Sequence, residues 1–408
     1  DEKGPAVPPK VPYRSFYSDS IATIEAKDAR TVVFRLKRPY APFLSNLAMF
    51  CAGIVSPEAV KKHGGEGFAR NPVGTGPFRF VSWNFGEKKI TLARNESYWR
   101  GPPPAEKVVF VTIPDNNARI SALRAGNCNW MDGLNAEDLD ACRKDATLKV
   151  WTGPAPNVGY LAMNTLRKPF DDVRVRRAVS LAVDRKKIVD ALYFGTGIPA
   201  VHPMPPGMLG YDESARIPAP DREKAKALLA EAGFPQGFDT VLYAMSNPRP
   251  YFPSPQKIAQ VIKSDLDAIG IRATIDTVGD WPLYREAVQN AKHPMCLLGW
   301  TGDNGDPDNF LYTFFSEESA KVGKGALSTS FWVDPAMQDL LAKGQAETDP
   351  AKRAAIYRDA LALVQREVPM VPISHMEQVF VSKSGFEGFH VQPTGDVNLL
   401  GVRATSTQ

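Results

Sequence analysis

Hydrophobic runs of strand length alternate with amphipathic segments of helical length through the second half of the chain. Residues 238–244 and 271–278 are two such runs, and a helical segment that ends at Gly270 lies between them. Another helical segment, residues 281–291, precedes a third run at residues 295–298. Because strands that alternate with helices tend to pair in parallel within one sheet, the pattern predicts an α/β domain.

Strand and helix signals continue through the rest of the chain. The predicted elements are a strand pair over 21–36, a short helix from Pro57, a hairpin over 78–94, a buried strand at 108–113, helices at 116–125, 172–193, 222–232, 335–348 and 350–367, and strands at 370–375 and 379–382. A Gly-Pro-Ala-Pro sequence near residue 156 indicates a domain junction, and the chain recrosses near residue 375. Two lobes joined by two crossing strands would leave a ligand cleft between them.

Composition and charge exclude several classes of protein. The net charge of +4 is small and no basic run occurs, so nucleic acid is not an expected partner. No apolar run approaches the roughly 18 residues that a membrane-spanning helix needs.

The four cysteines include no CxxC pair, although Cys128 and Cys142 could close a short loop. The chain begins with Asp1 and Glu2, without a signal peptide, which suggests that it has been processed or truncated.

The chain lacks the short motifs of hydrolases and nucleotide-binding enzymes. The patterns HExxH and GxSxG and the P-loop pattern are absent, and the five histidines are isolated from one another. We therefore expect no catalytic residue, no metal and no cofactor.

The most informative polar stretch is residues 297–310, LLGWTGDNGDPDNF. It begins as a buried strand and continues into a loop that carries Asp303, Asp306 and Asp308. Such a loop superficially resembles a calcium site, but its last glycine and its proline occupy places where alternating ligands should stand. A turn with solvated carboxylates is the simplest interpretation. A metal-dependent peptidase that uses the three carboxylates is the alternative from a different functional class.

A second polar segment follows the strand predicted at 238–244 and contains Arg249. Asp303 follows the strand predicted at 295–298, so both side chains are expected at the carboxyl edge of one sheet, where α/β domains bind ligands. Arginine can bind a carboxylate with two hydrogen bonds, and aspartate can bind an ammonium group. The pair therefore suits a zwitterionic ligand, unless the two side chains pair with each other or with solvent.

The loop at residues 299–310, GWTGDNGDPDNF, resembles the signature loop of periplasmic dipeptide-binding proteins, the substrate-binding subunits of family-5 peptide ABC transporters. Further matches are NPVGTGPF at 71–78, NVGYL at 157–161, PFDDVRVRRA at 169–178, KAKALL at 224–229, EAG at 231–233 and RPY at 249–251. The likeness thus covers most of the chain from about residue 20 onward.

This resemblance implies a two-lobed α/β periplasmic-binding-protein fold, type II-like, in the family-5 variant with an extra subdomain and with the N-terminal part missing. Three parts are expected: residues 1–78 as a partial accessory subdomain of lobe I, residues 79–156 as the core of lobe I, completed by 379–408, and residues 157–378 as lobe II, the α/β ligand-binding domain.

The resemblance also implies a function. Members capture dipeptides between their lobes by hinge closure and deliver them to an inner-membrane ABC permease, without making or breaking a bond. The protein would be a periplasmic monomer, secreted through a signal peptide that this chain does not contain. By position, the carboxylate-binding arginine of the family falls on Arg249 and the ammonium-binding aspartate on Asp303. Four further residues would line the ligand site: Trp300, Thr301, Gly302 and Tyr251.

The sequence also departs from the family pattern. The N-terminal part that supplies some lobe I contacts is missing, the family partner of Cys128 is absent, and Gly53 stands where some relatives place a polar pocket residue. Relatives in the wider family bind haem, cell-wall peptides, glutathione or nickel chelates, which are the alternative ligands. A chemosensory receptor subunit is a further alternative.

Overall fold

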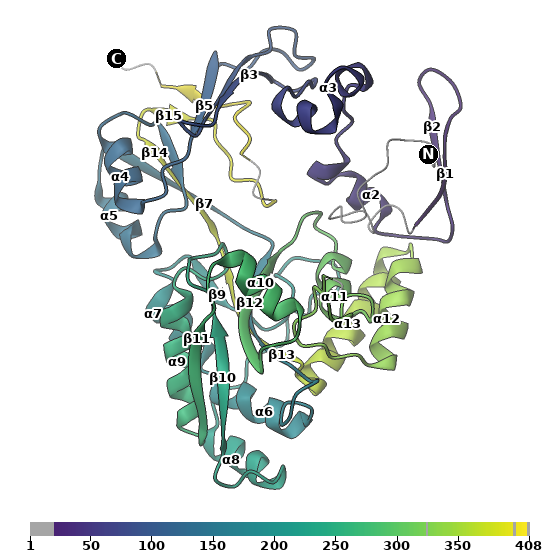
Figure 1. The fold of residues 1–408 in the computed structure, drawn as a ribbon, viewed down its shortest axis with the longest axis vertical. Helices are drawn as coiled ribbons and strands as arrows, with labels where there is room; N and C mark the ends of the chain where they lie inside the picture. The colour runs from purple at the N-terminus through teal and green to yellow at the C-terminus, as the bar shows by residue number, and fades with distance from the viewer. Residues whose placement is uncertain (1–19, 324, 395–396, 406–408) are drawn as a thin grey trace. The chain divides into compact units, whose positions relative to one another are not determined.

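The computed structural model describes residues 20–323, 325–394 and 397–405, and the contacts among them form two compact units (Figure 1). The first unit comprises the described residues up to Ala52 together with Pro156–Ala191 and Ile198–His375. The second comprises Gly53–Ala155, Leu192–Gly197 and the described residues from Met376 onward. The proline- and lysine-rich sequence of residues 1–20 predicts an irregular segment, and residues 1–19 of it lie outside the described residues. The three-part division at 1–78, 79–156 with 379–408, and 157–378 stays a prediction.

A mixed six-stranded sheet forms the centre of the first unit. Its strands, in spatial order, are β11 (Ile271–Thr277), β10 (Phe238–Ala244), β12 (Met295–Thr301), β8 (Asn157–Met163), β13 (Met370–Met376) and β9 (Gly197–Pro199). The strand β10 pairs in parallel with both β11 and β12, which confirms the predicted α/β arrangement. In contrast, β8 pairs antiparallel with β12 and β13 and is buried along its whole length.

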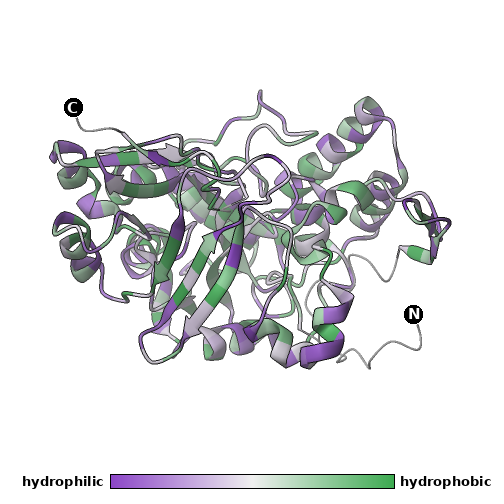
Figure 2. Cartoon of the chain, turned by 90° about the horizontal axis from the view of Figure 1, so that it is seen from above, coloured by the Kyte–Doolittle hydropathy of each residue, from purple (hydrophilic) through white to green (hydrophobic). Residues whose placement is uncertain are grey.

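Helices and one hairpin complete the first unit. They are β1 (Ile21–Ala26), β2 (Val32–Leu36), α2 (Phe43–Leu47), η1 (Phe50–Ala52), α6 (Val173–Ala182), α7 (Arg185–Leu192), α8 (Arg222–Glu231), α9 (Pro255–Asp267), α10 (Trp281–Gln289), α11 (Asp308–Phe315), α12 (Pro335–Ala346) and α13 (Pro350–Glu367). Along the helices, hydrophilic and hydrophobic residues alternate (Figure 2). That pattern is expected of helices that bury one face against a sheet or another helix.

Two predictions about these helices were wrong. The single helix expected over 172–193 is divided into α6 and α7, and the Asp184 carboxylate accepts a hydrogen bond from the Lys187 N–H at the start of α7. A side chain that caps a helix start favours a break just before it. The acidic loop is also shorter than expected, because α11 already begins at Asp308.

Two three-stranded sheets, one two-stranded sheet and several helices make up the described part of the second unit. The elements are α3 (Pro57–Arg70), β3 (Phe78–Asn84), β4 (Lys89–Arg94), β5 (Lys107–Val111), α4 (Asn116–Arg124), β6 (Trp130–Asp132), η2 (Ala136–Asp138), α5 (Leu139–Lys144), β7 (Leu148–Gly153), β14 (Gln378–Lys383), β15 (Phe386–Glu387) and β16 (Arg403–Ala404). The predicted hairpin is confirmed as β3 and β4. The prediction that residues 108–113 are buried was wrong, since four of the five residues of β5 are exposed.

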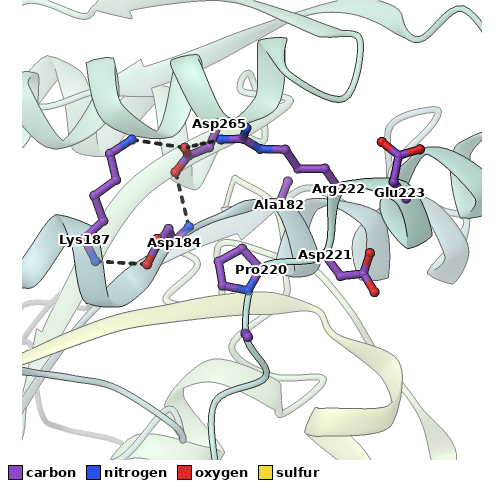
Figure 3. A pocket seen from close by; sticks show the side chains of 9 residues that line it. Ala182, Asp184, Lys187, Pro220, Asp221, Arg222, Glu223 and Asp265 are labelled. Carbon is purple, nitrogen blue, oxygen red and sulfur yellow. Dashed lines mark hydrogen bonds and ion pairs between the residues drawn. The ribbon is translucent and has the colours of Figure 1, made fainter.

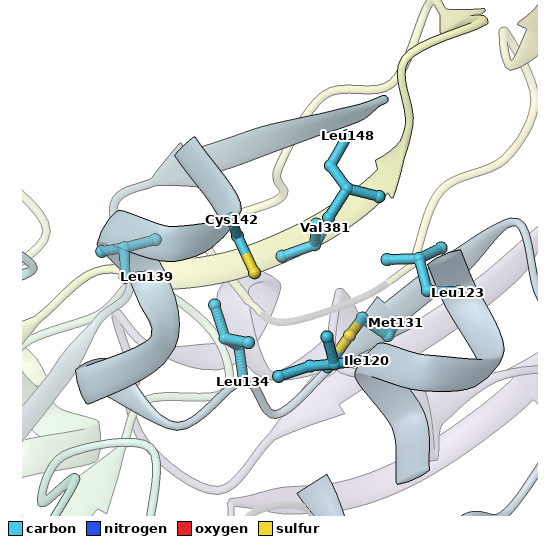
Figure 4. Close-up of a cluster of buried hydrophobic side chains, with 8 residues drawn as sticks. All are labelled: Ile120, Leu123, Met131, Leu134, Leu139, Cys142, Leu148 and Val381. Carbon is cyan, nitrogen blue, oxygen red and sulfur yellow. The ribbon is translucent and has the colours of Figure 1, made fainter. Parts of the chain in front are cut away.

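Buried side chains from α4, α5 and the sheet β6–β14–β7 form one apolar cluster of the second unit (Figure 4). Leu123 and Leu139 are fully buried there, and Val381 of β14 packs against the same cluster. The Cys142 thiol lies in this cluster and is free, so the considered link to Cys128 is not formed. Because Val381 comes from the C-terminal part of the chain, that part completes this cluster.

Candidate functional site

Two polar segments of the first unit follow neighbouring parallel strands, β10 and β12. The first contains Arg249 and follows the end of β10 at Ala244. The second contains Asp303 and follows the end of β12 at Thr301. Since the carboxyl ends of parallel strands meet at one edge of a sheet, both segments leave the sheet at the edge predicted from the sequence.

The Arg249 guanidinium lies over the indole ring of Trp281, the first residue of α10. The Arg249 Cζ atom is 3.6 Å from the ring centroid. The Nε atom is buried without a hydrogen-bond partner, and among the described residues the charged neighbours that shift the pKa of Arg249 include no carboxylate. Burial lowers the pKa of Arg249, and the nearby Arg285 lowers it further. Arg249 is thus a partly desolvated cation to which no described carboxylate lies close.

Backbone hydrogen bonds fix the turn that carries Arg249. Its N–H donates to the Phe252 carbonyl at 2.9 Å, and the Phe252 N–H donates back at 3.0 Å. Tyr251, within this turn, is only 6% exposed, and burial raises the pKa of its hydroxyl. A Cβ atom at Gly299 would come within 2.3 Å of the Tyr251 ring, so only glycine allows this packing. Tyr251 therefore forms a rigid wall against β12.

The residues at the end of β12 are held in place by the backbone and by Asn309. Trp300 and Thr301 belong to the strand, where they pair with β8. The Gly302 N–H donates to the Pro156 carbonyl at 2.6 Å, and a Cβ atom at Gly302 would come within 2.5 Å of the Phe310 ring. Both facts show that the backbone enters the Asp303 loop in a fixed position.

Asn309 is a positioning residue that the sequence analysis missed. Its Oδ1 atom accepts hydrogen bonds from Trp300 Nε1, at 2.9 Å, and from the Asp303 backbone N–H, at 3.2 Å. Asn309 is 1% exposed and belongs to the first turn of α11. The loop's proline was the one signal that could have indicated the helix start beside Asn309, because proline favours the first turn of a helix.

Asp306 is engaged in an internal ion pair. Arg353 of α13 donates from Nη1 and Nη2 to the two carboxylate oxygens, at 2.7 and 2.8 Å. Arg353 also donates to the Gly344 carbonyl at 2.7 Å and to the Tyr357 hydroxyl at 3.0 Å. The side chains of Asp306 and Arg353 are 5% and 7% exposed. The Asp306 carboxylate thus links the loop to α13.

Asp308 is also buried, with 4% of its surface exposed. Burial first, and the neighbouring Asp306 second, raise the pKa of its carboxyl to about 7. Its Oδ2 atom accepts a hydrogen bond from Gln345 Nε2 at 3.2 Å. The interpretation of the loop as a turn with solvated carboxylates was therefore wrong for Asp306 and Asp308.

These contacts bear on the peptidase alternative. That mechanism needs Asp303, Asp306 and Asp308 as metal ligands, but both oxygens of Asp306 already accept hydrogen bonds from Arg353. Within the described ranges, no group of three or more His, Cys, Asp or Glu side chains is placed to hold a metal ion. Among the described residues, no helix combines the length and the apolar composition that a membrane-spanning helix needs.

An α/β unit that presents a cation and a carboxylate-bearing loop after neighbouring parallel strands has the features of a small-molecule binding protein. Comparison with known families agrees with this class. A model described as "Bacterial extracellular solute-binding proteins, family 5 Middle" matches residues 5–321. The chain belongs to this family.

Individual relatives share most of the chain. A protein named "Dipeptide-binding protein" from Escherichia coli K12 is 36% identical over 379 residues, which are 92% of this chain and 70% of that protein. "Heme-binding protein A" from Haemophilus influenzae is 32% identical over 95% of this chain and 70% of its own length. The crystal structure of a dipeptide-binding protein from Pseudoalteromonas sp. SM9913, in complex with Met-Leu, superposes with a TM-score of 0.84 at 29% identity, covering 96% of this chain and 78% of that chain.

Proposed function

We propose that this chain binds dipeptides, with Arg249 as the partner of the peptide carboxylate and Asp303 as the partner of its ammonium group. The observation that carries the proposal is the environment of Arg249, a stacked and partly desolvated guanidinium to which no described carboxylate lies close. The relatives named for dipeptide binding support the same ligand class.

The charge of Arg249 gives the recognition its physical basis. A guanidinium presents two parallel N–H groups to a carboxylate, and stacking on Trp281 fixes the plane in which those groups lie. The nearby positive charge of Arg285 adds to the attraction for an anion. A ligand without a free carboxylate would leave the partly buried cation uncompensated, which is costly.

The loop that carries Asp303 is suited to the complementary role. The backbone N–H of Asp303 donates to Asn309, and the N–H of the preceding Gly302 donates to the Pro156 carbonyl. A carboxylate on a preorganised loop binds an ammonium group with less loss of conformational entropy than one on a mobile loop. Trp300 and Tyr251, on the segments beside it, would contact the peptide, and Thr301 and Gly302 would shape the same surface.

Delivery of the bound peptide to an inner-membrane ABC permease forms the second part of the proposal. It rests on membership of a family of extracellular solute-binding proteins. A periplasmic location and a monomeric state belong to the same proposal. Under this proposal the protein carries out no reaction on the peptide.

The test is calorimetric titration of the ligand-stripped chain with methionyl-leucine, its N-acetylated form and its C-terminal amide. The unmodified dipeptide should bind, and each modified form should bind far more weakly because one charge of the site loses its partner. Two variants assign the charges. In Arg249→Met the amide should bind as well as the free dipeptide, and in Asp303→Ala acetylation should no longer matter.

Equal binding of the free, acetylated and amidated peptides by the unmodified chain would contradict the charge assignment. Binding of haemin, without binding of any peptide form, would instead favour the function named for the Haemophilus influenzae relative. Release of free amino acids during the titration would favour the peptidase alternative.

A further inference from the structure

A cavity of about 180 Å³ lies in the first unit, and its lining residues include neither Arg249 nor Asp303. It is lined by the end of α13, the start of β13, the segment around Val201 and the start of α7. Most of its wall is apolar, from residues that include Val364, Met370 and Pro372. Its polar lining residues are Ser180, Arg185, Arg216 and Gln365, and Arg185 is the first residue of α7.

Arg185 is buried without a compensating negative charge. Its side chain is part of a residue that is only 6% exposed, and burial lowers its pKa to about 10, so the guanidinium stays protonated at neutral pH. Its Nη2 atom donates to Ser180 Oγ at 2.8 Å, whereas its Nε atom is buried without a partner. No carboxylate among the described residues forms an ion pair with it, and desolvation is the one cause of its pKa shift.

The surroundings add further positive charge. Arg216 also lines the cavity, and its own Nη1 atom is bound to the Glu213 and Ala215 carbonyls. The carboxyl end of α13 offers partial negative charge, about half a unit for a whole helix. However, Arg176 already donates to the Glu367 carbonyl of that helix end, and Arg177 donates to the Arg366 carbonyl. The helix end therefore leaves Arg185 largely uncompensated.

A charged cavity elsewhere in the same unit shows the contrast (Figure 3). There the buried carboxylate of Asp265 lies 3.5 Å from Lys187 Nζ and 3.9 Å from Arg222 Nη2, and it accepts a hydrogen bond from the Asp184 N–H at 3.2 Å. Its charge is balanced within the protein. The fold can thus neutralise a buried charge, and at Arg185 it does not.

We propose that the Arg185 cavity binds the carboxylate of a small aliphatic acid. Arg185 and the Ser180 hydroxyl, which accepts from Arg185 and so can donate its own proton, would bind the carboxylate oxygens. The alkyl group would pack against Val364, Met370 and Pro372. A volume of about 180 Å³ suits an acid of a few carbon atoms, since a water molecule occupies about 30 Å³ in the liquid. This site is independent of the proposed dipeptide site.

Isobutyrate and isobutyramide are the matched probes, because they share their shape and differ in charge. Calorimetric titration of the full chain with isobutyrate should show saturable binding. The same titration with isobutyramide should show none. Arg185→Met should weaken isobutyrate binding about a hundredfold, since a truncated charge partner costs at least that much in a buried pair. Arg358→Met, which changes an exposed arginine of α13, is the control and should bind isobutyrate normally.

Two further variants keep the test decisive. Arg185→Lys retains the charge and should bind isobutyrate with intermediate affinity, so it covers the case in which Arg185→Met does not fold. Arg249→Met should bind isobutyrate as the unmodified chain does, which separates this cavity from the dipeptide site. Loss of isobutyrate binding in Arg249→Met, equal binding of the amide, or displacement by equimolar chloride or phosphate would each overturn the proposal.

Discussion

The turn after β10 and the loop after β12 leave the same edge of the sheet, but their charged side chains have different partners. In the loop, the Asp306 carboxylate is bound at both oxygens by Arg353. In the turn, the Arg249 guanidinium has an aromatic ring beneath it and no described carboxylate close to it. The comparison shows that position in an α/β fold selects candidate residues. The local partners then decide which charges remain for a ligand.

The largest expected effect concerns the loop, where Arg353 neutralises the Asp306 carboxylate. Arg353→Met should lower the free energy of unfolding by about 3–5 kcal/mol, because it leaves the Asp306 carboxylate buried and unpaired. Urea denaturation measures the change. Arg358→Met, on the exposed face of the same helix, should change stability by no more than about 0.5 kcal/mol. Equal effects of the two variants would contradict a structural role for the Asp306–Arg353 pair.

A substitution of Arg249 in the turn should change the affinity for the dipeptide, whereas the stability of the protein should not fall. Arg249→Met should weaken dipeptide binding by about 2–5 kcal/mol, the cost of leaving the ligand carboxylate without its partner. Its free energy of unfolding should not fall, since the variant removes a partly desolvated charge. Arg272→Met is the control, because Arg272 is exposed and paired with Asp239. Unchanged affinity in Arg249→Met would rule out the terminal-charge model.

Asp308, which follows the loop after β12, should make the stability of the protein depend on pH. Its folded-state pKa of about 7 lies above the ordinary value of 3.8, so the folded protein holds this proton more tightly than the unfolded chain. The stabilising contribution is therefore complete below pH 4 and is lost as the pH rises through 7.

Asp308→Asn should remove this dependence, because the amide cannot ionise. Between pH 5 and pH 8 it should gain roughly 1–3 kcal/mol relative to the unmodified chain. Thermal and urea unfolding across the range measure the difference, with the exposed Asp339→Asn as the control. Parallel pH profiles for Asp308→Asn and the unmodified chain would show that Asp308 does not titrate in this range.

The smallest expected effect lies at Asn309, in the first turn of α11, which follows the Asp303 loop. Asn309→Ala removes the acceptor of the Trp300 and Asp303 hydrogen bonds and should weaken dipeptide binding by about 1 kcal/mol. The loss should appear mainly for peptides with a free ammonium group. Asn247→Ala, at an exposed position of the Arg249 turn, should bind peptides normally. A larger loss than in Arg249→Met would mean that Asn309 contacts the peptide directly.

The parts of the fold that follow from local patterns were predicted well. The bounds of β10 and α13 agree with the apolar run and the helical repeat in the sequence. The start of α11 at Asp308 was missed, because three aspartates and a proline read locally as a turn. The exposure of β5 could not be predicted, since burial of an apolar strand depends on what tertiary packing places against it.

The candidate site shows the same limit. Arg249 and Asp303 were selected as candidates because each follows a predicted strand, and the two strands are parallel neighbours in the structure. Trp281 beneath Arg249 and Arg353 beside Asp306 were missed. Both come from other helices, so no spacing along the chain indicates them. The sequence does not distinguish a charged side chain that is paired within the protein from one that remains for a ligand, and only the packed structure separates the two.

The central strand β8 has a consequence for how the protein folds. The carbonyl of its first residue, Asn157, accepts a hydrogen bond from His375 Nδ1, although 218 positions separate the two residues in the chain. On its other side, β8 pairs with β12, which is also distant in sequence. Long-range pairing of this kind slows folding, because a large loop must close before any contact is gained. During synthesis, the most deeply buried strand of the sheet must therefore wait for almost the last segment of the unit to emerge.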